Sequence, residues 1–306
     1  MNVALYTHPA CLRHQAGPGH PESPARLQAV LEALDDPRFS ALDRHEAPRA
    51  TREQLARVHD AALIDAIFAA SPRDGFVRLD ADTAMSADSL EAALRASGAV
   101  CAAVDTLIDG DATRAFCAVR PPGHHATRNT AMGFCLFNHV AIGAAHALAR
   151  GIERVAIVDF DVHHGNGTQD IFWSEPRVLY ASTHQSPLYP GTGMRAETGV
   201  GNIVNAPLPP RSGSSEFRVA FEQVVLPALH EFQPQLLMIS AGFDAHRLDP
   251  LADLNLDADD YAWATGELVD IAQKFAFGRI VSSLEGGYSL TALRGSTTAH
   301  VAALMG

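Results

Sequence analysis

Two aspartates and a histidine occupy alternate positions in one short segment, where Asp159, Asp161 and His163 follow an apolar run. If this run is a strand that continues through them, the three side chains point to the same side. Asp244 follows a second apolar run and adds another carboxylate. Two carboxylates and one imidazole form a three-ligand set that can hold a divalent metal ion and leave a position open for water or substrate. A lone aspartate at a strand end more often caps a turn, but this combination favours a metal site.

A histidine pair, His124 and His125, follows the rigid sequence Pro-Pro-Gly at residues 121–123. Beside a metal ion, one imidazole can remove a proton from water while the other stabilises charge. A carboxylate can orient such an imidazole through its ring N–H. Asp159 suits that role, because Asp161, His163 and Asp244 already complete a ligand set. An isolated histidine pair would indicate little, so the hypothesis depends on the nearby metal site.

A fourth reactive segment is Glu-Gly-Gly-Tyr at residues 285–288. Its two glycines allow the backbone to approach a site closely. The hydroxyl of Tyr288 could donate a hydrogen bond to an oxyanion that develops during hydrolysis. An ordinary core or surface tyrosine would be an equally good interpretation if the other motifs were missing.

These residues lie at the ends of four apolar runs, which begin at Arg114, Val155, Leu236 and Ile280. Ligands of open α/β sheets bind beyond the carboxyl ends of the strands, so four such ends describe one active site. Strand-like and helical segments alternate along the chain, which predicts a mainly parallel sheet with helices on both faces. Since there is no internal repeat and no linker, we expect one domain over residues 1–306.

Capping residues and apolar spacing predict the helices and the first strand. Ser23 is a candidate N-cap before Pro24, and Thr51 with Gln54 has the spacing of a capping box. A first strand is expected at residues 3–6. Longer helices are expected over residues 86–108, 138–150, 215–232 and 257–277, and glycines at 110, 151 and 278 are placed to end three of them.

The composition limits the classes of function. The 306 residues are 47% hydrophobic and carry a formal charge of −12, so no basic surface for direct nucleic-acid binding is predicted. Negative charge would attract cationic substrates, but it more often serves solubility. Four scattered cysteines indicate buried free thiols. Neither a secretory leader nor an apolar run of membrane-spanning length is apparent, which predicts a cytoplasmic protein without a membrane.

Seven motifs together resemble the zinc-dependent histone deacetylase superfamily, which includes bacterial histone-deacetylase-like amidohydrolases and acetylpolyamine amidohydrolases. They are Pro-Pro-Gly-His-His-Ala from 121, Gly-Phe-Cys-x-Phe-Asn from 133, Asp-x-Asp-x-His-His-Gly-Asn-Gly-Thr from 159, Pro-Gly-Thr-Gly from 190, Ala-Gly-Phe-Asp from 241, Asp-Pro from 249 and Glu-Gly-Gly-Tyr from 285. Gly-His-Pro-Glu-Ser-Pro-Ala-Arg from residue 19 extends the resemblance to nearly the whole chain. At position 166 the chain has Asn and resembles the class II branch, because class I members carry Asp there. The resemblance implies an open α/β fold, shared with arginases, with a central, mainly parallel eight-stranded sheet.

The resemblance also implies roles for the reactive residues. One Zn²⁺ per chain would be held by Asp161, His163 and Asp244. His125 would act as general base and then general acid, with Asn166 behind it. His124 would be its electrostatic partner, oriented by Asp159. Tyr288 would polarise the substrate carbonyl together with the metal.

Further positions match the substrate channel of the family and a structural K⁺ site. Phe134 and Tyr189 would line an acyl-lysine channel, although the second aromatic is usually Phe. The carbonyl of Gly133 would receive the substrate amide N–H, and Leu251 lies at the rim. The potassium ligands would come from Asp159, Asp161, His163, Ser182 and Thr183.

The predicted function is therefore deacetylation of acyl-lysine or similar acylated primary amines by metal-activated water. An acetylpolyamine amidohydrolase is the alternative. One polyamine-selective branch has an acidic gatekeeper where this chain has Leu251, although acidic groups at other positions would serve equally. An arginase-like binuclear hydrolase would need a second carboxylate where the chain has His246. A catalytically weak acyl-lysine binding protein is disfavoured by Tyr288. A homo-oligomer is compatible with the sequence.

Overall fold

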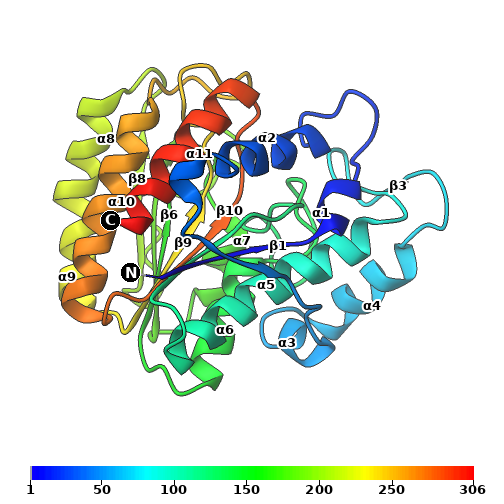
Figure 1. Ribbon diagram of the computed structural model, residues 1–306, viewed down its shortest axis with the longest axis horizontal. Helices are drawn as coiled ribbons and strands as arrows, with labels where there is room; N and C mark the ends of the chain where they lie inside the picture. Colours follow the sequence, from blue (N-terminus) through cyan, green and yellow to red (C-terminus); the bar gives the residue numbers. More distant parts are fainter. Residues whose placement is uncertain (1) are drawn as a thin grey trace.

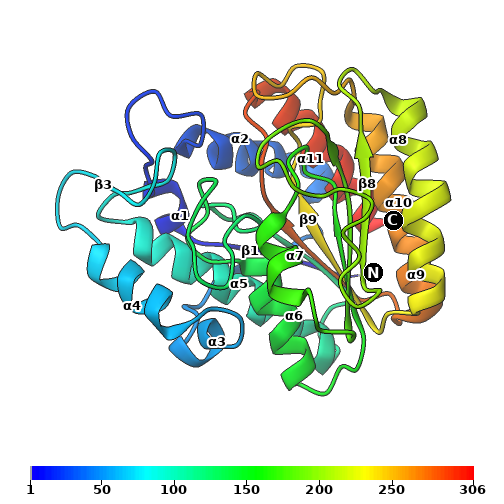
Figure 2. The same cartoon turned by 180° about the vertical axis from the view of Figure 1, so that it is seen from behind.

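A computed structural model describes residues 2–306 of the chain. An eight-stranded sheet runs through the molecule and is covered by helices on both faces (Figures 1 and 2). Its strands are β1 (Val3–Thr7), β2 (Asp43–Glu46), β5 (Arg114–Cys117), β6 (Val155–Asp159), β7 (Val178–Gln185), β8 (Ile203–Leu208), β9 (Leu236–Ala241) and β10 (Ile280–Leu284). A separate two-stranded ribbon pairs β3 (Val77–Arg78) with β4 (Ala84–Met85).

The spatial order of the large sheet is β2-β1-β5-β10-β9-β6-β7-β8. Every neighbouring pair is parallel, which confirms the predicted open α/β fold with its mainly parallel sheet. The four strands with reactive ends, β5, β10, β9 and β6, are neighbours at the centre. β10 joins two blocks of strands, β2-β1-β5 on one side and β9-β6-β7-β8 on the other.

Two groups of helices cover the sheet. α5 and α6 pack on one face, and α2, α10 and α11 pack together on the other (Figure 1). The helices are α1 (Pro9–Arg13), α2 (Pro24–Leu34), α3 (Arg52–Ala56), α4 (Ala61–Ala70), α5 (Ser89–Asp109), α6 (His139–Ala149), α7 (Asn166–Phe172), α8 (Ser214–Ala220), α9 (Leu226–Phe232), α10 (Ala258–Phe275) and α11 (Leu290–Met305), with a short 3₁₀ helix η1 (Pro37–Phe39) and a π-helix η2 (Phe221–Val225). None of these helices combines the length and apolar character needed to cross a membrane.

The predicted helix ends are largely those observed. α3 has the capping box of Thr51 and Gln54, and Gly110 ends α5 with a left-handed φ of 87°. α5 begins at Ser89 rather than residue 86, because Ser89 and Ser86 close a turn before the helix. The helix predicted over residues 215–232 is interrupted by the π-helical η2. α10 ends at Phe275, two residues earlier than predicted.

The central strands are buried on both faces. Every residue of β5, β6, β9 and β10 is buried, as expected for parallel strands between two helical layers. Side chains within these strands therefore contribute to the core. Only the loops that follow these strands can contact solvent or a ligand.

Candidate active site

A cluster of three candidate metal ligands lies beyond the ends of β6 and β9. Asp161, His163 and Asp244 offer ligand atoms that all lie within 4.8 Å of one another, and they form the one such group of His, Cys, Asp or Glu found among residues 2–306. The expected alternation along a continuing strand was wrong, because β6 ends at Asp159 and the next residues form a bend. This bend brings Asp161 and His163 to Asp244.

The chemistry of this cluster fits a divalent cation. His163 Nδ1 lies 3.1 Å from Asp161 Oδ1 and 3.2 Å from Asp244 Oδ2. Burial raises the pKa of Asp244, and the charge of Asp161 adds to this effect. A Cβ at Gly286 would overlap both carboxylates, so glycine is needed for this close approach. Two buried carboxylates that face a single imidazole are a donor set suited to zinc.

The two histidines before the cluster occupy different electrostatic environments. His124 Nδ1 lies 3.0 Å from Asp159 Oδ2. Burial alone would lower the pKa of His124, but the charges of Asp161 and Asp159 outweigh it and raise the pKa to about 10. Burial lowers the pKa of His125 well below its usual value, and the charge of His124 adds to this. The structure therefore separates a charged imidazole from a neutral one, although their ring centroids are only 4.0 Å apart.

Asn166 and Glu285 hold the segment that carries the histidine pair. His125 Nδ1 lies 2.8 Å from Asn166 Oδ1, at the first residue of α7. The Glu285 carboxylate accepts hydrogen bonds from the backbone N–H groups of Gly123 at 2.6 Å and His124 at 3.2 Å. Burial raises the pKa of Glu285 to about 7. No role is predicted for Glu285 from the sequence, although it is part of the Glu-Gly-Gly-Tyr motif.

Tyr288 is held from two sides. Its backbone N–H donates to Asp249 Oδ2 at 2.7 Å, and the guanidinium of Arg26 lies 4.8 Å from its ring centroid. Arg26 also donates to the carbonyls of Gly287 and Glu285, both at 2.5 Å. Burial raises the pKa of the Tyr288 phenol, which keeps it protonated and able to donate a hydrogen bond. Asp249 and Arg26 lie in motifs noted in the sequence, but their contacts with this loop could not be foreseen.

A cavity of about 190 Å³ opens above these groups. Its walls contain all four residues predicted to bind substrate, together with two further residues that the sequence did not single out. The lining consists of Asp82, His125, Gly133, Phe134, His163, Leu188, Tyr189, Leu251 and Tyr288. The aromatic walls stand edge-on to the reactive side chains, with Tyr189 5.2 Å from His125 and Phe134 6.0 Å from Tyr288 between ring centroids. Asp82 is the one carboxylate in this lining.

Of the residues predicted to bind potassium, Asp161 and His163 belong to the cluster, and the other three lie on the neighbouring strands β6 and β7. Asp159 is the Cα partner of Ser182 across β6 and β7. The Ser182 hydroxyl lies 2.9 Å from His184 Nδ1, and the buried Thr183 hydroxyl has no hydrogen-bond partner among residues 2–306. The potassium site stays a prediction.

The position of His246 bears on the arginase-like alternative. Its Nδ1 accepts a hydrogen bond from the backbone N–H of Leu248 at 3.1 Å. His246 therefore engages its own loop, and it supplies no carboxylate for a second metal ion. The geometry favours one metal ion at Asp161, His163 and Asp244.

Fold and site together define a metal-dependent hydrolase of the parallel α/β class. The histone deacetylase domain family matches residues 20–304, and the chain belongs to this family. It is 38% identical over 311 residues to a histone deacetylase-like amidohydrolase of Pseudomonas aeruginosa, an alignment that covers 94% of this chain and 82% of the relative. It is 37% identical over 324 residues to the chloroplastic histone deacetylase 14 of Arabidopsis thaliana, an alignment that covers 99% of this chain and 76% of the relative. The crystal structure of the HDA15 HD domain superposes with a TM-score of 0.94 at 36% identity, covering 99% of this chain and 88% of that one.

These similarities confirm the predicted hydrolytic deacetylase, and zinc dependence is typical of the family. They also confirm that acylated compounds are the class of substrate.

Proposed function

We propose that the protein removes acetyl or related acyl groups from acyl-lysine or similar linear acylated primary amines. The observation that carries this proposal is the cavity itself, which is flanked by Phe134 and Tyr189 and reaches His125, His163 and Tyr288. Apolar side walls suit the methylene chain of an extended amine. The polar groups lie together where the amide would be placed.

Asp161, His163 and Asp244 would hold the zinc ion. When bound there, zinc would supply Lewis-acid chemistry, which activates water and polarises a carbonyl group. The carboxylates are held in place by backbone donors, from Gly286 to Asp161 at 2.8 Å and from Val162 to Asp244 at 2.9 Å. We further propose a structural potassium ion near Asp159, Asp161, His163, Ser182 and Thr183, supported by the unpaired hydroxyl of Thr183.

Each side chain of the site is assigned its own role in hydrolysis. Neutral His125 takes a proton from water as the water oxygen bonds to the acyl carbon. Tyr288 donates a hydrogen bond to the acyl oxygen as negative charge develops there, and cationic His124 supports the same charge. His125 then passes the proton to the amine nitrogen as the C–N bond breaks, which releases a carboxylic acid and a free amine. The carbonyl of Gly133 would accept the substrate amide N–H.

The metal proposal is tested by elemental analysis of the purified protein. We expect one zinc per chain, and loss of metal when Asp244→Ala removes a ligand. Asp253→Ala, a change to an exposed carboxylate in the following loop, should keep the metal. Two tightly bound metal ions per chain would instead support a binuclear hydrolase.

Acetylpolyamine hydrolysis is the second candidate, and Asp82 is the observation that favours it. This carboxylate lines the cavity and could attract the distal ammonium group of a polyamine. Leu251, which also lines the cavity, brings no charge. The sequence leaves the position of an acidic gatekeeper open apart from Leu251, and Asp82 is a carboxylate of the cavity lining that could fill this role.

A substrate panel decides between the two candidates. The ratio of kcat/KM for acetyl-lysine peptides to that for acetylspermidine and acetylputrescine should be at least one at physiological salt, where diffuse attraction is screened. A preference for acetylpolyamines of more than about tenfold, or about 1.4 kcal/mol, would favour the polyamine function. Asp82→Asn should then reduce that preference, whereas Asp74→Asn, a change to an exposed carboxylate outside the cavity lining, should not. A cytoplasmic location, the oligomeric state and the lack of nucleic-acid binding stay predictions.

A further inference from the structure

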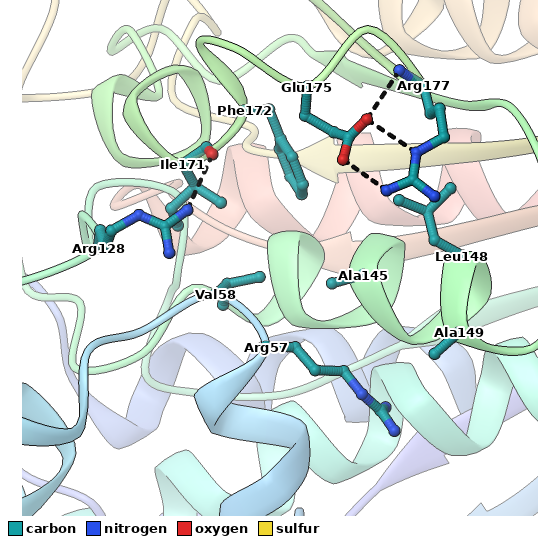
Figure 3. A pocket seen from close by; sticks show the side chains of 10 residues that line it. All are labelled: Arg57, Val58, Arg128, Ala145, Leu148, Ala149, Ile171, Phe172, Glu175 and Arg177. Atoms are coloured by element: carbon teal, nitrogen blue, oxygen red, sulfur yellow. Dashed lines mark hydrogen bonds and ion pairs between the residues drawn. The ribbon is translucent and has the colours of Figure 1, made fainter.

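A second cavity, of about 360 Å³, lies between the end of α3, α6 and α7 (Figure 3). It has no lining residue in common with the cavity above the candidate metal ligands. Ile171 and Phe172 from α7 and Leu148 from α6 supply apolar side chains to its wall, together with Val58. Such a volume is comparable to that of small-molecule sites.

Three arginines surround this apolar surface, and Figure 3 places them on different sides of it. Arg177 is paired with Glu175 at 2.6 Å, and Arg57 with the exposed Glu53 at 3.2 Å. Arg128 has no carboxylate within 4.0 Å among residues 2–306, and its guanidinium donates only to the carbonyl of Ile171 at 3.3 Å. The lining therefore has an excess of positive charge in a chain whose formal charge is −12.

We propose that this pocket binds a small organic anion with an apolar body, and that the ligand carries a carboxylate or phosphate group. The guanidinium of Arg128 would receive the anionic group, because it lacks a partner of opposite charge. Leu148, Ile171 and Phe172 would cover the apolar body. A purely inorganic anion would contact Arg128 but not the partly buried Leu148, and a neutral apolar compound would contact Leu148 without using the charge of the exposed Arg128.

The pocket shares two segments with the active site. Arg128 follows His125 by three residues, and its backbone N–H donates to Asp170 Oδ2 of α7 at 3.2 Å. α7 begins at Asn166, which contacts His125, and ends at Phe172 in the pocket wall. An anion held between Arg128 and the end of α7 would therefore act on both segments that position the base. We expect it to change kcat and to leave KM unaltered, because it does not occupy the substrate cavity.

Calorimetry on the full chain tests binding. Hexyl phosphate and hexanoate carry the same kind of apolar body with a phosphate or a carboxylate, so they distinguish the two anionic groups. Hexan-1-ol lacks the anionic group, and inorganic phosphate lacks the apolar body. At least one of the first pair should bind about tenfold more tightly than both of the second pair. Equal binding of hexan-1-ol, or of inorganic phosphate, would overturn the proposal.

Matched variants locate the bound anion. Arg128→Gln should weaken binding by about tenfold or more, because a charge-assisted hydrogen bond is lost. Arg211→Gln removes the same charge from an exposed side chain elsewhere and should leave the affinity unchanged. Leu148→Glu, which places a negative charge in the pocket wall, should abolish binding while circular dichroism stays that of the parent. Equal affinities of parent, Arg128→Gln and Leu148→Glu would place the anion elsewhere and refute the proposal.

Turnover of an acetyl-lysine amide tests the connection with the active site. A saturating concentration of the bound probe should change kcat at constant KM in the parent, and this effect should disappear in Arg128→Gln. An increase in KM that persists in Arg128→Gln would mean that the probe enters the substrate cavity. Tight binding with no change in kcat would refute the connection. Binding is measured without substrate, so failure of the deacetylase proposal would leave the calorimetric result intact.

Discussion

Two buried histidines, His124 and His300, show how differently this fold treats the same side chain. Both are almost completely buried, at 2% and 0% exposure. His300 lies in the helical layer, where its ring nitrogens contact the hydroxyls of Thr265 at 2.7 Å and Ser282 at 2.8 Å. Burial lowers its pKa to about 3, whereas carboxylates around His124 raise that pKa to about 10.

The difference shows that burial alone does not create a reactive group. His300 is hydrogen-bonded to neutral hydroxyls and stays neutral, so it contributes to packing and to hydrogen bonding in the core. His124 forms an ion pair with Asp159 and lies near Asp161, so it stays charged beside the candidate metal ligands. The carboxylates that follow the strand ends keep His124 charged, whereas the hydroxyls around His300 leave it neutral.

The largest expected effect is the loss of His125. His125→Ala should reduce kcat by roughly 10³-fold, since the group that moves the proton is removed. His124→Ala should also reduce kcat, but the double variant should lose little more than His125→Ala, because the two residues act as a unit. Steady-state kinetics with an acetyl-lysine amide measure this, and His300→Gln serves as the control that keeps kcat. Multiplicative losses in the double variant would contradict cooperation within the pair.

The second effect concerns the phenol of Tyr288. Tyr288→Phe removes one oxygen atom and should reduce kcat by roughly 10²-fold or more, because the hydrogen bond to the developing oxyanion is lost. Metal content and melting temperature should stay those of the parent. Tyr261→Phe is a matched control, since it removes another buried phenol that lies outside the cavity lining. An unchanged rate in Tyr288→Phe would remove this tyrosine from the proposed mechanism.

A smaller effect is expected at Asp249, which holds the backbone of Tyr288. Asp249→Ala should lower kcat by about tenfold, because a misplaced donor stabilises the transition state less well. Asp249→Asn keeps one acceptor oxygen and should recover most of the rate. KM should change little in both variants. Equal losses in the alanine and asparagine variants would show that charge, rather than the hydrogen bond, is what matters.

The smallest expected effect lies in the helical layer and concerns stability. Below pH 6.5 the unfolded chain protonates His300, while the folded protein keeps it neutral down to about pH 3. The free energy of unfolding should therefore fall as the pH falls through this window, by about 1.4 kcal/mol per pH unit at most from this residue. Urea unfolding between pH 7 and pH 5 should give a shallower pH dependence for His300→Gln than for the parent. Identical slopes would mean that His300 is not the neutral group assigned to it.

The sequence predicted the parallel sheet well, because the alternation of strands and helices is a local pattern. It also predicted which residues meet at the site, since the carboxyl ends of parallel strands lie along one edge. It failed on the local path of Asp161 and His163, because periodicity does not show where a strand stops. The ligands still converge, since the bend after Asp159 replaces the expected alternation.

Glu285, Asp249 and Asp82 mark the limit of such reasoning. Each is one of many acidic residues in the sequence. The importance of Glu285 and Asp249 depends on partners far away along the chain, and that of Asp82 on its place in the cavity lining. Glu285 binds the backbone at residues 123–124, and Asp249 binds the backbone of Tyr288. Backbone donors have no sequence signature, so contacts of this kind appear only once the fold is known.

The central position of β10 determines when the sheet can assemble during translation. β10 is the last strand to be synthesised, yet it separates β5 from β9. Before residue 280 emerges, the nascent chain can form only two smaller sheets with unpaired inner edges, which are sites of mispairing. The histidine pair follows one of these sheets, and the three candidate metal ligands follow the other. The site can therefore be completed only after β10 has been synthesised, when this short strand joins both sheets and brings Tyr288 with it.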